Sequence, residues 1–329
     1  MNAVIVGCGL IGAKRARFLN GARLIACVDE DADRARTLAS AHAGAEFSDN
    51  WREAVERKDV DLVIVCTRHD SLSAIALRAI NARKHVLIEK PAARFSSEIE
   101  PLIGAAAQSN VCVRVGFNHR YHFAFRKARE LIDAGSLGPL LYIRARYGHG
   151  GRPGYEKEWR ADPKLSGGGE LIDQGVHLID LARWFLGDFV NISGRAFTYY
   201  WKMTVDDNAF MLLETADRKT AFMHASCTEW KNLFSFEIFG RDGKLEITGL
   251  GGSYGVEQLA FYKMLPQMGP PETTKWEFPM DDRSWALEFS SFLEDIRLGR
   301  QPAPGLADAQ AALRVVEQIY KESGYHYRE

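Results

Sequence analysis

Residues 1–19, MNAVIVGCGLIGAKRARFL, decide the fold of the first part of this chain. The apolar run 3–6 predicts a buried strand, and residues 13–19 have the spacing of a helix. Between them, Gly7-Cys8-Gly9-Leu10-Ile11-Gly12 matches the GxGxxG pattern in the context that this pattern requires. Its glycines allow a tight turn, close approach of a pyrophosphate, and close packing of helix on strand. The stretch therefore predicts phosphate groups at a helix N-terminus.

The alternation of strand and helix continues to about Asn118. Short apolar runs predict further strands at 24–28, 62–66, 85–88 and 111–117. Helical patterns lie between them at 32–41, 51–58, 73–82 and 97–108. Regular alternation with continuous apolar strands predicts a parallel, doubly wound sheet that is covered on both faces.

After Asn118 the pattern changes to a mainly antiparallel one, with a tight turn at Arg241-Asp242-Gly243. The predicted strands are 140–147, 190–201, 209–214, 220–228, 234–239 and 244–248. A helix that carries Asp173 and His177 interrupts this series and ends at Gly187. Two more helices are predicted at 282–298 and 306–321. With 329 residues, two domains are expected.

The second predicted strand ends at Asp29, where an acidic residue would bind both ribose hydroxyls of a dinucleotide. A helix cap is the alternative role, because Asp31 and Asp33 follow. Glu30 and Asp31 would repel a 2′-phosphate, so NAD is expected rather than NADP. The predicted domains are an NAD-binding Rossmann domain at 1–119 and an α/β domain at 120–329 that has a mainly antiparallel open sheet.

The composition is that of an ordinary globular protein, with 46% hydrophobic and 26% charged residues. A formal net charge of −1 gives no basis for binding nucleic acid. The cysteines, five in number and far apart, predict reduced thiols and a cytoplasmic protein rather than a disulfide framework or a zinc cluster. Lys14 and Arg15 come too early for a signal peptide, and no apolar run has the length of a membrane span.

Lys90 follows the predicted strand 85–88, at the strand end where open α/β sheets bind ligands. Pro91 stiffens the turn that presents it. A surface lysine that caps a strand is the alternative interpretation. The residues expected to contact the cofactor are Gly7, Gly9, Leu10, Ile11, Gly12, Asp29, Thr67, Glu89 and Lys90.

Residues 167–177, GGGELIDQGVH, place an acid and an imidazole four residues apart in an apolar segment. In a helix, Asp173 and His177 would lie one turn apart on the same face. A carboxylate and a histidine that are buried cost free energy unless they are paired, and such groups are frequent at functional sites. Three interpretations compete: a structural Asp/His pair, a metal site and an acid/base pair. No third ligand with useful spacing accompanies the two, so we expect no metal.

Residues 147–169 are rich in glycine, aromatic and basic residues, which is typical of a binding loop, although a solvated charged loop has the same composition. Tyr155 or Trp159 could stack on a substrate or cover the cofactor, and Arg120, Arg152 or Arg160 could meet a carboxylate or phosphate. The expected substrate-binding residues are Arg120, Tyr147, His149, Tyr155, Trp159 and Arg160.

Taken in order, GCGLIG, Glu89-Lys90-Pro91 and Gly167-Gly168-Gly169 with Asp173 and His177 resemble the Gfo/Idh/MocA family of sugar and inositol oxidoreductases. The resemblance covers essentially the whole chain, including residues 116–120 and 206–208. It implies a Rossmann domain followed by an α/β domain whose open sheet commonly forms dimers or tetramers. It also implies that Lys90 and His177 flank the reacting hydroxyl, with Asp173 beside them. Leu72 stands where many members carry a histidine.

The expected reaction is hydride transfer between a CHOH group of a sugar, sugar derivative or sugar nucleotide and the nicotinamide. His177 is the expected base in oxidation and acid in reduction, because its reference pKa of about 6.5 suits this role. Lys90 would stabilise the developing negative charge, and Asp173 would orient a partner or a substrate hydroxyl. Lys90 as the base, an inositol dehydrogenase, an NAD-dependent glycosidase and a non-catalytic nucleotide-binding regulator are the alternatives.

Overall fold

The computed structural model describes residues 1–267 and 269–325, which form two compact units. The first unit contains residues 1–117, 165–167 and 285–313. The second contains residues 118–164, 168–284 and the chain from 314 onward. The expected boundary at residues 119 and 120 lies close to the division after Phe117, and residues 285–313 return to the first unit.

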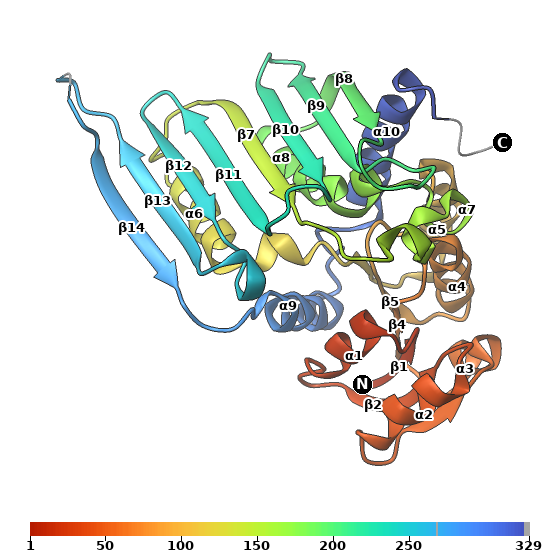
Figure 1. Ribbon diagram of the computed structural model, residues 1–329. Coiled ribbons are helices and arrows are strands. Elements are labelled where there is room, and N and C mark those ends of the chain that lie inside the picture. Colours follow the sequence, from red (N-terminus) through yellow and green to blue (C-terminus); the bar gives the residue numbers. More distant parts are fainter. Residues whose placement is uncertain (268, 326–329) are drawn as a thin grey trace. The chain divides into compact units, whose positions relative to one another are not determined.

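The first unit contains a six-stranded parallel sheet with the order β3-β2-β1-β4-β5-β6 (Figure 1). Its elements before residue 118 are β1 (Asn2–Val6), α1 (Leu10–Ala16), β2 (Arg23–Val28), α2 (Ala32–Ser40), β3 (Glu46–Ser48), α3 (Trp51–Glu56), β4 (Leu62–Val65), α4 (His69–Asn81), β5 (His85–Ile88), a 3₁₀ turn (Ser96–Glu98), α5 (Glu100–Ser109) and β6 (Val113–Val115). Most of α9 (Ser284–Leu298) and the first part of α10 (Leu306–Glu322) also belong to it. The strand order is that of a doubly wound Rossmann sheet, which confirms the predicted fold of this half.

The central strands are apolar along their whole length because both faces of the sheet are covered. Ile5, Ile64 and Leu87 are fully buried in the core of this unit. Strand β3 was not predicted, since it has only three residues and is mostly exposed. Strand β6 is shorter than predicted, because it begins at Val113 and ends at Val115, where the Phe117 amide turns back to the Val115 carbonyl.

The second unit contains an eight-stranded sheet with the order β14-β13-β12-β11-β7-β10-β9-β8 (Figure 1). Its elements are a 3₁₀ turn (Asn118–Tyr121), α6 (Phe123–Asp133), β7 (Leu140–Gly148), 3₁₀ turns (Tyr155–Lys157, Trp159–Ala161), a π-helical turn (Leu171–Gly175), α8 (Val176–Leu186), β8 (Phe189–Phe197), β9 (Asn208–Thr215), β10 (Thr220–Ser226), β11 (Leu233–Gly240), β12 (Gly243–Thr248), a 3₁₀ turn (Gly252–Tyr254), β13 (Glu257–Lys263) and β14 (Glu272–Phe278). The short helix α7 (Pro163–Ser166) spans the division at Leu165. Among the described strand pairs of this eight-stranded sheet, only β7–β10 is parallel, so the prediction of a mainly antiparallel sheet is confirmed.

One face of this sheet is buried and the other is open. Ile143, Met211 and Met223 point to the buried face, against which α8 packs. Neighbouring positions on the same strands, such as Phe210 and Phe222, are exposed. The alternation follows from the two-residue period of a strand. Helix α6, which the sequence analysis did not predict, packs beside β13.

Two predictions for this unit differ from the structure. The strand predicted at 190–201 ends at Phe197, because the Asp207 carboxylate accepts the backbone N–H groups of Tyr199, Tyr200 and Trp201 and so takes them out of the sheet. Strands β13 and β14 were not predicted. Strand β14 is a polar, largely exposed edge strand, so it lacks the apolar alternation that marks a half-buried strand.

A buried ion-pair network holds α1 to the C-terminal part of the first unit. The Arg15 side chain is 1% exposed and donates to Glu89 at 2.6 Å and to Glu288 at 2.5 Å. Its guanidinium also lies 4.3 Å from the centroid of the Trp285 ring. Burial raises the pKa of the Glu288 carboxyl, and the charge of Arg15 opposes that rise. The network therefore depends on a guanidinium between two carboxylates.

Replacing Arg15 by Met should lower the free energy of unfolding by about 3–5 kcal/mol, because two buried carboxylates then lose their cation. Chemical denaturation followed by circular dichroism measures the change. The matched control is Arg36→Met, which removes an exposed pair with Asp33 and should cost less than about 1 kcal/mol. Equal stability of Arg15→Met and the wild-type protein would show that the Arg15 ion pairs do not stabilise the fold.

Candidate active site

The loop between β1 and α1 has the backbone geometry of a phosphate-binding turn. Gly7 has φ +96°, and a Cβ there would lie 2.5 Å from the carbonyl oxygen of Cys66. A Cβ at Gly12 would lie 1.9 Å from the carbonyl oxygen of Gly7. Nothing lies within 4 Å of a Cβ built at Gly9, and the neighbouring Leu10 is exposed. Gly7 and Gly12 are required by close packing, whereas Gly9 leaves open space where a ligand's phosphates can approach.

Asp29, at the end of β2, is linked directly to this loop. Its carboxylate accepts the Cys8 amide at 2.6 Å and the Asp31 amide at 2.9 Å. Asp31, and not Asp29, caps α2 by accepting from the Asp33 and Arg34 amides. The half-buried Asp29 therefore stands where the fingerprint requires a ribose-binding acid.

The remaining predicted cofactor residues follow β4 and β5. Thr67 is half-buried, and its hydroxyl accepts from Ser71. Lys90 is half-buried and lies immediately after Glu89, whose amide donates to Val65. The Glu89 side chain is buried against Arg15, which favours a structural role for its carboxylate. Ile11 lies in the first turn of α1.

In the second unit, Asp173 and His177 lie on consecutive elements rather than on one regular helix. Asp173 belongs to the π-helical turn, and His177 to the first turn of α8. Both are buried, with 6% and 4% exposure. The π-helical turn changes the angular spacing that an unbroken α-helix would give them, and such turns occur frequently at functional sites.

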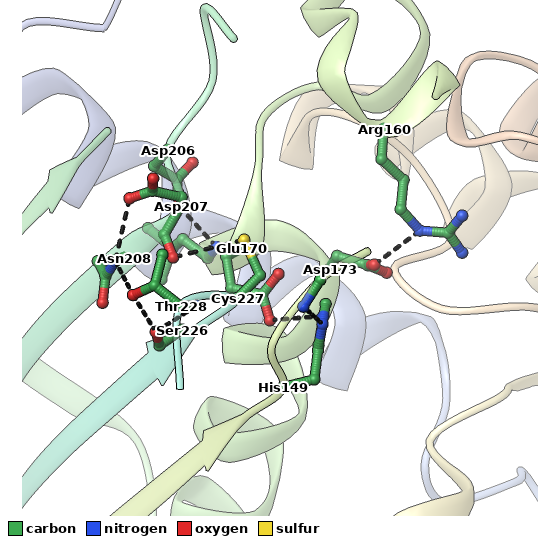
Figure 2. A network of polar contacts seen from close by, with 12 residues as sticks. His149, Arg160, Glu170, Asp173, Asp206, Asp207, Asn208, Ser226, Cys227 and Thr228 are labelled. Carbon is green, nitrogen blue, oxygen red and sulfur yellow. Dashed lines mark hydrogen bonds and ion pairs between the residues drawn. The ribbon is translucent and has the colours of Figure 1, made fainter. Parts of the chain in front are cut away.

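Asp206 holds the start of this turn. Its carboxylate accepts the Gly169 amide at 2.9 Å, the Leu171 amide at 2.8 Å and the Tyr320 hydroxyl at 2.7 Å. Asp206 is fully buried, and burial raises the pKa of its carboxyl to about 6 against the opposing effect of these hydrogen bonds. A Cβ at Gly169 would lie 1.9 Å from the Asp206 carbonyl oxygen, so glycine is required at this contact. Figure 2 shows Asp206 and Asp207 beside the segment that carries Glu170 and Asp173.

Two basic side chains meet the acids of this segment (Figure 2). Arg160 Nε lies 2.9 Å from Asp173 Oδ2, and His149 Nε2 lies 3.5 Å from Glu170 Oε1. Burial by itself lowers the pKa of His149, but the hydrogen bond to Glu170 and the charge of Glu170 raise it further than burial lowers it. Asp173 therefore lies beside the Arg160 guanidinium, which stabilises its charge, and Glu170 lies beside a histidine whose pKa it raises.

His177 is surrounded by aromatic rings. His119 stacks on it with a centroid distance of 3.9 Å and an interplanar angle of 26°. Tyr147 meets it edge-on at 6.3 Å, and Tyr254 packs on Tyr147 at 5.5 Å. Burial is the largest cause that raises the pKa of Tyr147 well above its usual value and that of Tyr254 to about 12. Near neutral pH these phenols can donate hydrogen bonds but cannot serve as bases.

The other predicted substrate residues have varied environments. Tyr155 is 5% exposed and packs between His149 and Trp201, with centroid distances of 5.6 Å to each ring. Trp159 is half-buried, and its ring lies against the Arg160 guanidinium. Arg120 is buried in a two-pronged pair with Asp180, at 2.8 and 2.5 Å, which favours a structural role over substrate binding.

Sequence reasoning assigned no chemical role to His119, Glu170, Tyr254 or Asp206. Glu170, His119 and Asp206 lie within quoted motifs, so a search for polar residues in those motifs would have found them. Tyr254 carries no such signal, because its contact with Tyr147 joins distant parts of the chain.

Among residues 1–267 and 269–325, no three His, Cys, Asp or Glu side chains are grouped so that they could hold a metal ion. Within the same residues, no helix combines the length and the apolar character needed to cross a membrane.

A doubly wound sheet with a glycine phosphate loop and a ribose-binding acid, followed by a unit with a buried acid and imidazole, defines a dinucleotide-dependent oxidoreductase. Residues 1–117 match the model of the oxidoreductase family with an NAD-binding Rossmann fold, and residues 125–246 match the model of the GFO/IDH/MocA C-terminal domain. The chain belongs to the Gfo/Idh/MocA family. The expected family, fold class and NAD cofactor are thereby confirmed.

Curated relatives and solved structures agree with this assignment. The chain is 26% identical to inositol 2-dehydrogenase of Rhizobium meliloti, over 95% of this chain and 94% of that protein. It is 30% identical to inositol 2-dehydrogenase 2 of Saccharopolyspora erythraea, over 65% of this chain and 63% of that protein. The fold is shared with a levoglucosan dehydrogenase solved with NADH and levoglucosan, at 21% identity and a TM-score of 0.90, over 98% of this chain and 97% of that one.

Replacing Asp29 by Asn should weaken NAD binding about tenfold, because a hydrogen bond to a charged acceptor is worth about 1.5–3 kcal/mol and the amide carries no charge. Selectivity for NAD over NADP should fall as well, since less negative charge then opposes a 2′-phosphate. Titration calorimetry with each cofactor measures both effects. Asp33→Asn, which changes an exposed acid in the first turn of the following helix α2, is the control and should bind NAD normally. Undiminished affinity in Asp29→Asn would contradict the assigned ribose contact.

Asp206 should make stability depend on pH. Its carboxyl loses its proton near pH 6 in the folded chain and near its model value of 3.8 in the unfolded chain. Between these values the folded state binds more protons, so this group's contribution to the free energy of unfolding falls as pH rises. From pH 4.5 to 7 the wild-type value should therefore fall by about 2 kcal/mol relative to Asp206→Asn, as measured by urea denaturation. A constant difference between the two proteins would contradict the raised pKa.

Proposed function

We propose that this chain is an NAD-dependent dehydrogenase that oxidises a CHOH group of an uncharged sugar or cyclic polyol. The observation that carries the proposal is the buried segment from Gly169 to His177. A hydrogen bond to Asp206 holds the start of its π-helical turn, which contains Asp173, and His177 follows in the first turn of α8. Proton transfer from a hydroxyl needs such a base in a water-poor environment. The names of the relatives, inositol 2-dehydrogenase and levoglucosan dehydrogenase, support the same reaction class.

The first unit fits the dinucleotide that its family description implies. Gly7 and Gly9 would hold the pyrophosphate at the start of α1, and Asp29 would hold the ribose hydroxyls, because the open space at Gly9 and the acid at the end of β2 meet the two requirements of the fingerprint. When bound, NAD supplies a nicotinamide that accepts a hydride. The remaining chemistry is removal of the hydroxyl proton and stabilisation of charge on the reacting oxygen.

His177 is the proposed base. The neighbouring phenols of Tyr147 and Tyr254 are excluded from this role near neutral pH, because burial raises their pKa values. Asp173 is an ion-pair partner of Arg160, so we assign it to orienting a substrate hydroxyl and supporting the positive charge that His177 acquires. His177 would return the proton when the reaction runs as a reduction.

Lys90 is proposed to donate a hydrogen bond to the reacting oxygen. It follows β5 at the carboxyl edge of the first sheet, which is where ligands of open α/β sheets bind. Its ammonium would stabilise negative charge as the hydroxyl proton leaves. The alternative, in which Lys90 is the base, requires a neutral amine.

The ion pairs of the second unit favour an uncharged substrate. Arg160 lies beside Asp173 and Glu158, Arg152 lies 2.6 Å from Glu158, and Arg120 pairs with Asp180. Each arginine that could have met a carboxylate or phosphate of the substrate already has a carboxylate of the chain. Binding an anion at Arg120 would require breaking a buried pair, which costs free energy. The pairs of Arg152 and Arg160 are partly exposed, so an anion there would compete with a carboxylate of the chain at a smaller cost. A neutral polyol avoids this cost.

Replacing His177 by Asn or Lys90 by Ala should each lower turnover about a hundredfold or more, because each removes proton transfer or charge stabilisation in the transition state. Affinity for NAD should stay within about twofold of the wild-type value in His177→Asn, since the proposed contact of His177 is to the substrate. Steady-state absorbance of NADH gives turnover, and calorimetry gives affinity. Near-normal turnover in both variants would overturn the two assignments.

A panel of inositols, neutral sugars, sugar acids and sugar nucleotides, each tested with NAD, checks the activity itself. We expect NADH formation with one or more neutral polyols and weaker rates with the anionic compounds. Cleavage of glycosides with tightly retained NAD would instead favour the glycosidase alternative. Nucleotide binding without activity on any compound would favour a regulatory protein.

The oligomeric state and the cytoplasmic location are also proposed rather than shown. The open face of the second sheet supports a homodimer or homotetramer, because Phe210, Leu212 and Phe222 form exposed apolar positions on neighbouring strands. Exposed apolar surface of this kind is typical of protein interfaces.

A further inference from the structure

A second imidazole stacks on the proposed base. His119 and His177 stack with their centroids 3.9 Å apart, and both rings are buried. The two come from different elements, the 3₁₀ turn Asn118–Tyr121 and helix α8. Face-to-face contact at this distance restricts rotation of the His177 ring about its side-chain bonds, because rotation would bring the rings into collision.

A hydrogen-bonded chain fixes the protons on His119. The Ser284 hydroxyl donates to the Asp282 carboxylate at 2.6 Å, because a carboxylate can only accept. Ser284 Oγ then accepts from the Asn118 side-chain NH₂ group at 2.8 Å. This orientation turns the Asn118 carbonyl oxygen toward His119 Nδ1, at 3.3 Å. Since that oxygen can only accept, His119 Nδ1 must carry a proton.

The stack also limits the charge on the two rings. Two imidazolium ions at 3.9 Å would repel each other strongly in a buried environment. If His177 takes the substrate proton, His119 must therefore be neutral, with its single proton on Nδ1. A third imidazole, that of His122, lies 5.5 Å from the His119 ring. Its Nδ1 pairs with the Glu257 carboxylate at 3.0 Å, so His122 has a partner of its own outside the stack.

We propose that His119 is a positioning residue for the base: held as the neutral Nδ1–H form by Asn118, it keeps the His177 ring in the orientation needed to accept the hydroxyl proton. The role in turnover rests on the proposed function, whereas the protonation state and the stack do not. The inference also assigns Asn118, Ser284 and Asp282 to the support of the active site.

The protonation state is tested by NMR on the NAD-bound protein labelled with ¹⁵N-histidine, between pH 6.5 and 8. The His119 signals are assigned by their loss in His119→Phe. We expect a neutral ring that is protonated at Nδ1, and a change of the His177 signals in His119→Ala that is larger than in His119→Phe. A His119 ring that is protonated at Nε2 alone or is positively charged throughout this range would overturn the proposal, even if the enzyme shows the expected activity.

The positioning role is tested by kinetics on His119→Ala and His119→Phe with the best polyol of the panel. His119→Ala should lower kcat at least about tenfold with KM for the polyol within about threefold, because a small misplacement of a catalytic group slows chemistry more than binding. His119→Phe restores a stacking ring, so its kcat should stay within about threefold of the wild-type value. Circular dichroism checks the fold of each variant.

Other results would overturn this role. A raised KM with unchanged kcat in both variants would show direct substrate binding by His119, and normal kinetics in His119→Ala would show that the stack has no effect. If the wild-type protein oxidises no polyol, the proposed function fails, and the NMR measurements still decide the protonation state and the stack.

Discussion

The buried carboxylate of Asp206 is the constraint on which the candidate site depends. A fully buried carboxylate is costly unless several donors satisfy it, and here two backbone amides and the Tyr320 hydroxyl do so. Those donors come from the start of the segment that bears Asp173 and from α10. The hydrogen bonds that offset the cost of burying Asp206 therefore also fix the backbone where the π-helical turn begins.

The candidate catalytic residues of the second unit come directly after this fixed point in the chain. The turn presents Asp173 to Arg160, and α8 begins at once and places His177 under His119. The arginines of this unit are already paired with carboxylates of the chain, which is why we favour an uncharged polyol. The first unit contributes separately, through open space at Gly9 for the NAD phosphates and through Lys90 at the end of β5.

Much of this could be predicted from the sequence, where the signal is local. The glycine loop, Asp29 and the apolar strands identified the parallel sheet, because each depends on a few neighbouring residues. The placement of Asp173 and His177 on one regular helix was an expectation that the π-helical turn modifies. The Arg15 network and the His119 stack could not be predicted, since each joins residues that are distant in the chain. The early end of β8 depends on a nearer residue, because the Asp207 carboxylate accepts amides only six to eight residues before it. The carboxylate partners of Arg120, Arg152 and Arg160 were not predicted, and they favour an uncharged substrate over the carboxylate or phosphate that these arginines could have met.

The most direct test of the central claim is to follow the hydrogen itself. The polyol that reacts in the panel is prepared with deuterium on its CHOH carbon and is incubated with the protein and NAD, and the nicotinamide product is analysed by mass spectrometry. The account predicts one deuterium in each NADH formed, carried at C4 of the ring, together with a ketone product. NADH that contains no deuterium, or polyol consumption without a stoichiometric amount of NADH, would contradict it.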